Sequence, residues 1–379
     1  MFELKKNFPG LSYITANSKE TQDSSVIDLT GEFSSSNPPV ELVNLVTDAI
    51  NYGDKHYDLD GYYPLREIIS EQFFTEYSYR YNPNTEITIN SGYHQAYSSI
   101  ISALIKEGDE IILFEPSYYT YLPTIEANGG RPVYVQLKQP DFHINWDDVQ
   151  KLISVRTKLI ILNSPNHVTG SILTASDMER LSKIVNGTNI FILSDETYGS
   201  IIFEGYEHQS IARYPRLADR SFIISGFSKL LNIDTWQISF CLAPEKLMAG
   251  LRKMQHFQIF SANLPFQIAL TNYLRQGYNK SEAGEKIQKK RDILLKNLRS
   301  SKLTFLPSTG SFFQLFNYSK YSSAKDLVLC QELLANQTLK VTPISYFYHD
   351  AIDLRYFRVS FAKPEELLIR ANETLLNLS

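Results

Sequence analysis

Six short hydrophobic runs recur between residues 85 and 245, and stretches with a helical pattern separate them. Each run is continuously apolar rather than alternating, which is typical of strands that are buried on both faces. Such strands form a mostly parallel sheet with helices on both sides. The pattern therefore predicts an α/β domain. The predicted strands are residues 87–89, 111–114, 159–162, 190–193, 222–224 and 238–242.

Helical periodicity appears in the remaining segments, first over residues 42–50 and then over residues 93–106. After about residue 275 the pattern changes to that of a smaller α+β domain, which we expect the N-terminal segment to complete. Its predicted elements are helices over 281–300 and 364–376 and strands over 311–316 and 357–361. We therefore predict a large α/β domain over residues 45–275 and a small domain formed by residues 1–44 together with 276–379.

The composition limits the function classes. A chain of 379 residues, 43% of them hydrophobic, can build roughly two to three domains with a large core. The net charge of -4 offers no basic field for nucleic acid. Two cysteines are too few for a disulfide framework or a zinc site, so we predict no metal. The start MFELKKNF lacks the apolar segment of a signal peptide, and no apolar stretch approaches the roughly 20 residues that span a bilayer. We expect a cytoplasmic protein without a membrane partner.

Polar and aromatic residues follow the predicted strands where each strand ends. Ligands of open α/β sheets bind beyond these carboxyl ends. Gly92 precedes a predicted helix, whose first N–H groups, around Gly92, Tyr93 and His94, can hold an anion. Tyr118 follows the second strand and offers an aromatic face, and residues 163–170 follow the third.

The next two strand ends add ionisable groups. Asp195 and Tyr198 follow the strand at 190–193, and Lys229 follows the strand at 222–224. A lysine amine can form a Schiff base with an aldehyde. An anion site, a flat ring, a carboxylate, a phenol and a lysine together describe a pocket for pyridoxal 5'-phosphate.

Each group has an expected role in that pocket. Lys229 would form the Schiff base, Asp195 would keep the pyridine nitrogen protonated, and Tyr118 would stack on the ring. Tyr198 would donate a hydrogen bond to the phenolic oxygen of the ring. Far downstream, Arg358 lies in an otherwise apolar strand, where its two-pronged guanidinium could hold an α-carboxylate.

In order and spacing these motifs resemble the class I and II aminotransferases of fold type I, and within them the kynurenine and methionine aminotransferase branch. The resemblance implies a fold type I large domain, a small domain and a homodimer with its active sites at the subunit interface. It also implies transfer of an amino group between an amino acid and a 2-oxo acid, with Lys229 forming the internal aldimine and then moving the proton. The matching segments are 61–67 (GYYPLRE), 114–121 (FEPSYYTY), 163–170, 195–198, Lys229 with Trp236, 260–270 (FSANLPFQIAL) and 357–362 (FRVSFA).

Several positions depart from the family pattern. The asparagine that bonds the phenolic oxygen falls on His167 by ungapped counting, or on Asn166 if the loop has one extra residue. A neutral imidazole at this place could still donate one hydrogen bond. The tyrosine that the family lends to the neighbouring subunit's phosphate stands five residues before a glycine, whereas Tyr57 stands four before Gly61 and His56 takes the family spacing.

The phosphate contacts are also altered. The family serine three residues before the lysine is Gly226, with Ser225 and Ser228 as candidate replacements. The family cation eight residues after the lysine is Gln237. Exchanging a charged for a neutral hydrogen-bond partner would weaken cofactor binding roughly tenfold.

Alternatives stay open at this point. The altered cofactor contacts favour considering another reaction of the same cofactor, such as that of a β-lyase, an amino-acid oxidase or hydroxylase, or a cyclase. A non-catalytic protein on this scaffold would have no need to keep Lys229, Asp195 and Arg358 together. Asp195 could instead cap a helix, and Arg358 could pair with Glu365 or Glu366. The aromatic residues suit an aromatic or thioether substrate, and no second cation for a dicarboxylic substrate was located.

Overall fold

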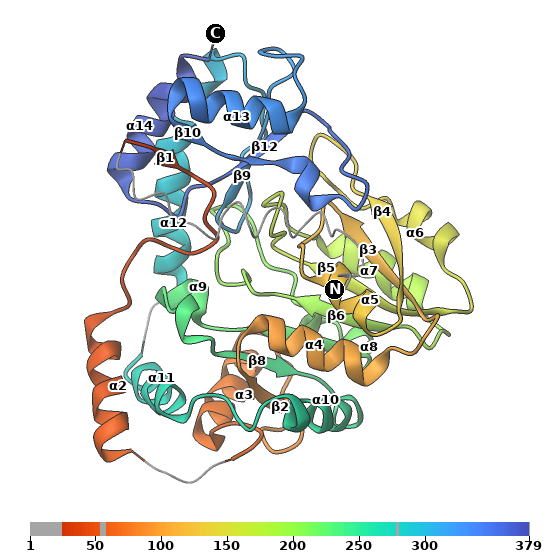
Figure 1. Ribbon diagram of the computed structural model, residues 1–379. Helices are drawn as coiled ribbons and strands as arrows, with labels where there is room; N and C mark the ends of the chain where they lie inside the picture. The colour runs from red at the N-terminus through yellow and green to blue at the C-terminus, as the bar shows by residue number, and fades with distance from the viewer. Residues whose placement is uncertain (1–24, 54–57, 278–279, 379) are drawn as a thin grey trace, which may run out of the picture.

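A seven-stranded sheet lies at the centre of the computed structural model, which describes residues 25–53, 58–277 and 280–378 (Figure 1). Its strand order is β2-β8-β7-β6-β5-β3-β4. Strands β3 to β7 pair in parallel, and β8 is antiparallel to both β2 and β7. The predicted, mostly parallel sheet and its six strands are thus confirmed. The strands are β2 (Ile87–Asn90), β3 (Glu110–Glu115), β4 (Arg131–Gln136), β5 (Thr157–Asn163), β6 (Phe191–Asp195), β7 (Ser221–Ser225) and β8 (Ser239–Leu242).

Strand β4 was not predicted. It is an edge strand that pairs only with β3 within this sheet, and its sequence RPVYVQ contains Pro132, which an edge strand tolerates. Its residues are mostly half-buried. A strand of this kind lacks the continuous apolar run that identified the others.

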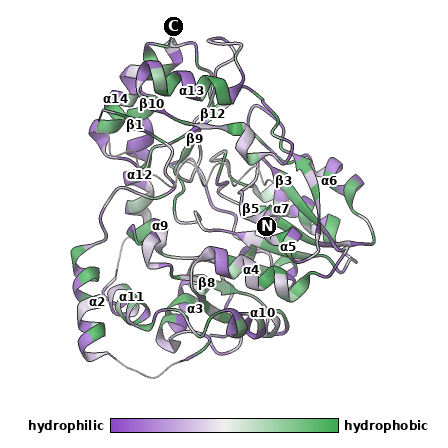
Figure 2. Cartoon of the chain, viewed as in Figure 1, coloured by the Kyte–Doolittle hydropathy of each residue, from purple (hydrophilic) through white to green (hydrophobic). Residues whose placement is uncertain are grey.

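Helices cover both faces of the sheet. Ile111 and Leu113 of β3 pack in the core beneath α4, α5 and α10, whereas Ile112 and Phe114 pack in the core on the other side, against α3, α6, α7, α8 and α11. Figure 2 shows these strands as predominantly hydrophobic and the surrounding helices as two-sided. The helices are α2 (Val40–Tyr52), α3 (Tyr63–Tyr77), α4 (Tyr93–Leu104), α5 (Tyr121–Ala127), α6 (Trp146–Leu152), α7 (Ala175–Val185), α8 (Pro215–Ala218), α9 (Ser228–Leu231), α10 (Glu245–Gln258) and α11 (Leu264–Arg275).

The C-terminal part forms a second core with its own small sheets. A three-stranded antiparallel sheet has the order β11-β12-β9, and β1 pairs in parallel with β10. The N-terminal strand therefore lies beside C-terminal elements (Figure 1). The elements are β1 (Ile27–Asp28), α12 (Lys280–Leu295), β9 (Phe313–Asn317), α13 (Asp326–Gln337), β10 (Leu339–Lys340), β11 (Thr342–Pro343), β12 (Tyr356–Ser360) and α14 (Glu365–Leu376), with 3₁₀ turns at Ile211–Arg213, Asp234–Trp236, Leu298–Ser300 and Ile344–Phe347.

The predicted boundary between residues 44 and 45 falls inside α2, which packs along α11. A division at that point would cut a helix, so the exact domain limits remain a prediction. Among the described residues, no helix is both long and apolar enough to cross a membrane.

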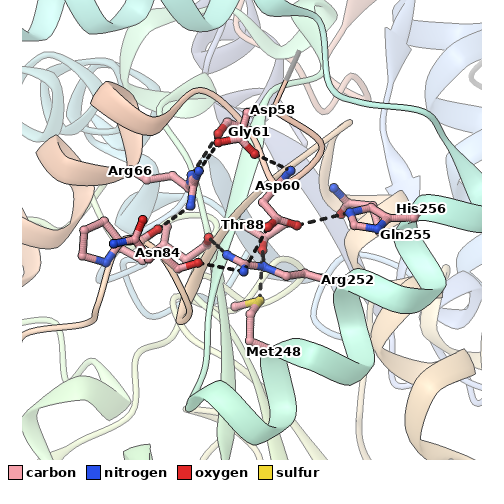
Figure 3. Close-up of polar contacts among 12 residues, drawn as sticks. Asp58, Asp60, Gly61, Arg66, Asn84, Thr88, Met248, Arg252, Gln255 and His256 are labelled. Atoms are coloured by element: carbon pink, nitrogen blue, oxygen red, sulfur yellow. Dashed lines mark hydrogen bonds and ion pairs between the residues drawn. The ribbon is translucent and has the colours of Figure 1, made fainter. Parts of the chain in front are cut away.

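A network of two arginines and two aspartates fixes the chain before α3 (Figure 3). Arg66 of α3 pairs with Asp58. Arg252 of α10 lies 3.0 Å from the Asp60 carboxylate and donates a 2.8 Å hydrogen bond to the carbonyl of Ile87 in β2. The segment that begins at Asp58 is thereby anchored to the central sheet. Tyr57, a predicted cofactor contact, and His56 lie outside the described residues.

The end of β3 is joined to the C-terminal part by a second polar contact. The Glu115 carboxylate accepts hydrogen bonds from the backbone N–H of His349, at 2.7 Å, and lies 3.0 Å from Nδ1 of its ring. Two residues on, the N–H of Ser117 donates to the carbonyl of Phe347 at 2.9 Å. The His349 ring stacks on Tyr134 of β4 with 3.6 Å between ring centroids. These contacts tie residues 347–349 to one edge of the sheet.

Candidate active site

Lys229 lies in α9, the short helix directly after β7, and only 5% of its side chain is exposed. Its ammonium lies 2.8 Å from Oδ1 of Asp234 and donates a 3.1 Å hydrogen bond to the backbone carbonyl of Glu32. The rings of Phe33, Tyr198 and Phe312 surround it at 5.1–5.5 Å from their centroids. The lysine is therefore enclosed by the protein.

Asp195 ends β6 on the neighbouring strand and is 2% exposed. Its Oδ2 accepts hydrogen bonds from the hydroxyls of Tyr97, at 2.6 Å, and Tyr121. Its Oδ1 accepts from the hydroxyl and the N–H of Thr197. These four donors hold the carboxylate in one orientation at the carboxyl end of the sheet. Such fixation exceeds what an N-cap requires.

Tyr198 is fully buried, and its hydroxyl has no hydrogen-bond partner among the described residues. A buried hydroxyl without a partner is costly in free energy, by about 1–3 kcal/mol. It is therefore available to a ligand. The centroid of its ring lies 5.1 Å from the Lys229 ammonium and 5.6 Å from that of the His167 ring.

Gly92 is the N-cap of α4 and has a φ of 82°. The first N–H groups of a helix have no partner within it, so those around Tyr93 and His94 can bind an anion. A β-carbon on Gly92 would overlap Oε1 of Gln237, and Nε2 of this glutamine donates to the carbonyl of Asp234 at 2.6 Å. Gln237 thus packs directly against the predicted phosphate site. The His94 side chain contacts Tyr118 rather than the predicted phosphate site, because its Nε2 lies 2.6 Å from the Tyr118 hydroxyl.

The hydroxyls of the two candidate serines near Lys229 already donate hydrogen bonds to backbone carbonyls. Ser225 donates a 3.4 Å hydrogen bond to the carbonyl of Glu196, and Ser228 donates a 3.2 Å bond to that of Ile238. The Tyr93 hydroxyl is buried close to Ser228, but it makes no hydrogen bond of good geometry with any described residue. Burial raises the pKa of Tyr93, so its hydroxyl keeps its proton and can donate. A β-carbon on Gly226 would lie 2.7 Å from this hydroxyl.

The loop after β5 separates the roles of Asn166 and His167. The Asn166 side-chain oxygen accepts the N–H groups of Val168 and Thr169, at 2.8 and 2.9 Å, and so closes its own turn. The His167 ring instead lies 4.1 Å from the ring of Tyr118, measured between centroids. His167 is thus the member of the pair that faces the pocket. Burial lowers its pKa, although the nearby Glu32 acts in the opposite direction.

Arg358 comes from β12 and is 1% exposed. Its guanidinium lies 4.0 and 4.4 Å from the ring centroids of Phe313 and Phe347. One nitrogen donates to the carbonyl of His167 at 3.1 Å, and another lies 3.6 Å from Oε1 of Glu32. Glu365 and Glu366, the structural partners considered above, are exposed at the start of α14.

Four residues of this pocket were missed by the sequence reasoning: Glu32, Tyr97, Tyr121 and Asp234. Asp234 stands five residues after Lys229, and this short separation is the sequence signal that could have indicated their contact. Tyr121 belongs to a quoted motif but was given no role. Glu32 and Tyr97 reach the site through tertiary contacts that no local pattern marks.

The donor set fits pyridoxal phosphate. Lys229 suits the aldehyde and Asp195 the ring nitrogen, while the hydroxyls of Tyr198 and Tyr93 suit oxygen atoms of the cofactor. At the phosphate end, the described residues offer the N–H groups of α4 and, where the family has a cation, the neutral Gln237, with the Asp234 carboxylate nearby.

Comparisons with known proteins agree with this chemistry. A family model described as aminotransferase class I and II matches residues 46–375. A methionine aminotransferase of Escherichia coli is 32% identical over 371 residues, which cover 97% of this chain and 96% of that protein. A kynurenine–oxoglutarate transaminase of Dictyostelium discoideum is 25% identical, covering 93% and 90%. A solved E. coli structure described by a methionine aminotransferase function superposes with a TM-score of 0.90 at 32% identity, covering 97% of this chain and 96% of that one.

Proposed function

Because the chain belongs to the class I and II aminotransferase family, whose members use pyridoxal phosphate, we propose that the pocket around Lys229 binds this cofactor and exchanges amino groups. The donor would be an α-amino acid and the acceptor a 2-oxo acid. The observation that carries the assignment is the convergence of Lys229, Asp195 and Tyr198 at adjoining strand ends, with Arg358 facing them from β12.

When bound, the cofactor supplies an electron sink for the pair left behind as a proton leaves Cα of the amino acid. Lys229 would hold the aldehyde of the cofactor, and its Nζ, once free, would take the proton from Cα and deliver it to the former aldehyde carbon of the cofactor. Asp195, fixed by Tyr97 and Tyr121, would hold the ring nitrogen. Tyr198 would donate its unused hydrogen bond to the ring oxygen, and its burial with Lys229 would keep water from the reacting atoms.

The geometry favours His167 over Asn166 as the second contact of the ring oxygen. Tyr118 supports the ring face, with its hydroxyl held by His94. The phosphate is assigned to the N-terminus of α4 at Gly92 and Tyr93, helped by the Tyr93 hydroxyl in place of a serine. Ser225, Ser228 and Gln237 shape this end through their bonds to backbone carbonyls.

The substrate assigned to the pocket is an amino acid with an aromatic or thioether side chain. Arg358 takes the α-carboxylate, and the surfaces around it are the rings of Phe313 and Phe347. Rings favour apolar or sulfur-containing side chains over a second carboxylate. The methionine specificity named for the E. coli relative agrees with this choice.

A homodimer in the cytoplasm completes the proposal. Exposed apolar side chains gather on α2, at Val40 and Ile50, and near the end of α10, at Phe257 and Phe260. Such patches support association. Both cysteines are buried and unpaired, which suits a reducing compartment.

The test is a screen of amino acids with purified, cofactor-loaded protein. We expect accumulation of pyridoxamine phosphate when an aromatic or sulfur-containing amino acid is added without a 2-oxo acid. Lys229→Ala should lose this reaction, whereas Lys246→Ala, a change at an exposed lysine of α10, should keep it. Release of ammonia, uptake of oxygen or formation of pyruvate without pyridoxamine phosphate would contradict the assignment.

A further inference from the structure

Glu32 stands between the two groups that the proposed function assigns to the two ends of an amino acid. Its carboxylate lies 3.6 Å from the Arg358 guanidinium, and its backbone carbonyl accepts the Lys229 ammonium at 3.1 Å. The glutamate follows β1 in a segment of the chain that also carries Phe33, whose ring faces Lys229. One residue thus occupies both the carboxylate-binding and the amine-binding position.

The same carboxylate oxygen also faces His167. Oε1 of Glu32 lies 3.0 Å from His167 Nε2, and both side chains are largely enclosed, with exposed fractions of 13% and 8%. Arg358 further ties the group together, because it donates to the backbone carbonyl of His167. Glu32 therefore belongs to a compact arrangement of one carboxylate, one imidazole and one guanidinium.

A buried guanidinium needs an anion, and the Glu32 carboxylate supplies one. A substrate α-carboxylate would need the same fork of Arg358. Two carboxylates at this distance from one cation repel each other in a site shielded from water. Either the substrate carboxylate does not bind to Arg358, or Glu32 moves away from the guanidinium.

We propose that Glu32 is an internal stand-in for the substrate carboxylate, which an incoming amino acid displaces from Arg358. This inference rests on the proposed function of Arg358. It makes Glu32 a specificity-determining residue. A ligand is retained when its carboxylate outcompetes Glu32 for the Arg358 guanidinium.

Displacement leaves the Glu32 carboxylate beside His167, whose Nε2 lies 3.0 Å from Oε1. The groups facing the His167 ring are Glu32, Lys229 and Arg358, together with the phenols of Tyr118 and Tyr198. Burial and the two cations lower the pKa of His167, and Glu32 raises it. Once the substrate carboxylate neutralises Arg358, a proton on His167 restores the local charge balance. Carboxylate binding should therefore take up a proton.

The experiment measures binding of 3-phenylpropanoate, a carboxylate without an amine, to the cofactor-loaded protein by calorimetry. Titrations in two buffers of different ionisation enthalpy report the protons exchanged. For the unsubstituted protein we expect a net uptake of protons on ligand binding. Glu32→Gln should tighten binding about tenfold, because a charged partner of Arg358 becomes a neutral one. It should also abolish the proton uptake.

Glu32→Asp is the matched variant, since it keeps the charge and withdraws the carboxylate by one methylene. Tighter binding in this variant supports occupation of Arg358 by Glu32, whereas binding equal to the unsubstituted protein would mean that general charge explains the glutamine result. Unchanged or weaker binding by Glu32→Gln, or undiminished proton uptake, overturns the inference. Arg358→Gln tests the premise separately: if it binds the ligand as well as the unsubstituted protein, the assigned role of Arg358 fails.

Discussion

The hydroxyl oxygen of Tyr93 lies 2.7 Å from the point that a β-carbon on residue 226 would take. The glycine and the tyrosine therefore fit each other: the missing side chain leaves the space that the phenol fills. A serine was expected at position 226 from the family pattern. The structure offers the Tyr93 hydroxyl, buried and making no hydrogen bond of good geometry with any described residue, as the replacement donor.

Gly226→Ser should destabilise the protein by about 1–3 kcal/mol, because the new side chain overlaps the phenol. Tyr93→Phe removes the oxygen and should relieve this overlap in the double variant. Urea unfolding of the two single variants and the double variant measures the coupling. Additive effects would mean that the two positions do not share this space. Tyr93→Phe alone should weaken cofactor binding by up to about tenfold.

Asp234→Asn should destabilise the cofactor-free protein by about 3–5 kcal/mol, because it leaves the enclosed Lys229 ammonium without its carboxylate. The penalty should shrink when the cofactor is bound, since Lys229 then has a different partner. The variant should consequently bind pyridoxal phosphate more tightly. Unfolding with and without cofactor, and cofactor titration, provide the measurements. Equal destabilisation of both forms would contradict this role of Asp234.

Asp195→Asn should lower the stability of the cofactor-free protein by about 1–3 kcal/mol. The carboxylate accepts two phenol hydrogen bonds on Oδ2 and two more bonds from Thr197 on Oδ1. Whichever oxygen the amide NH2 group of asparagine replaced, this group would face hydrogen-bond donors and could accept none of their bonds. Thermal or urea unfolding against Asp219→Asn, a change at an exposed aspartate, isolates this effect. The rate of pyridoxamine phosphate formation should fall as well.

Glu196 predicts a pH dependence of folding. Burial would raise its pKa, but His208, 2.9 Å away, and the N–H of Ile211 hold the pKa below its usual 4.5. A carboxyl with a lowered native pKa binds fewer protons when folded, so its stabilisation is present above about pH 4.5 and is lost as the pH falls below that. Glu196→Gln should reduce the free energy of unfolding at pH 7 and flatten its decline below pH 4.5. The free energy of unfolding of both proteins should be measured with urea across this pH range. If it falls with the same slope below pH 4.5 in the variant and in the unsubstituted protein, the assignment to Glu196 is wrong.

The strands could be predicted because their evidence is local. Runs such as residues 159–162 are apolar at every position, and this character follows from burial on both faces. The edge strand β4 escaped because it is only half-buried and contains Pro132. The positions after the strands could also be inferred, since parallel strands bring their carboxyl ends together.

The finer parts of the site depend on tertiary contacts. Counting along the loop could not choose between Asn166 and His167, because the choice follows from which side chain closes the turn. Glu32 reaches Arg358 across more than 300 residues of sequence, and its role follows from the β1–β10 pairing that carries its segment to the C-terminal part. The hydrophobic pattern along the sequence does not indicate a contact between residues this far apart.

The contacts at Glu115 have a mechanical consequence. The bonds from Glu115 to His349 and from Ser117 to Phe347 hold the C-terminal part to the end of β3, and Phe347 also packs on Arg358. The Glu32–Arg358 pair therefore lies next to this joint, since Arg358 contacts both Glu32 and Phe347. A ligand that separates Glu32 from Arg358 would act directly beside the contacts that hold the two parts of the molecule together.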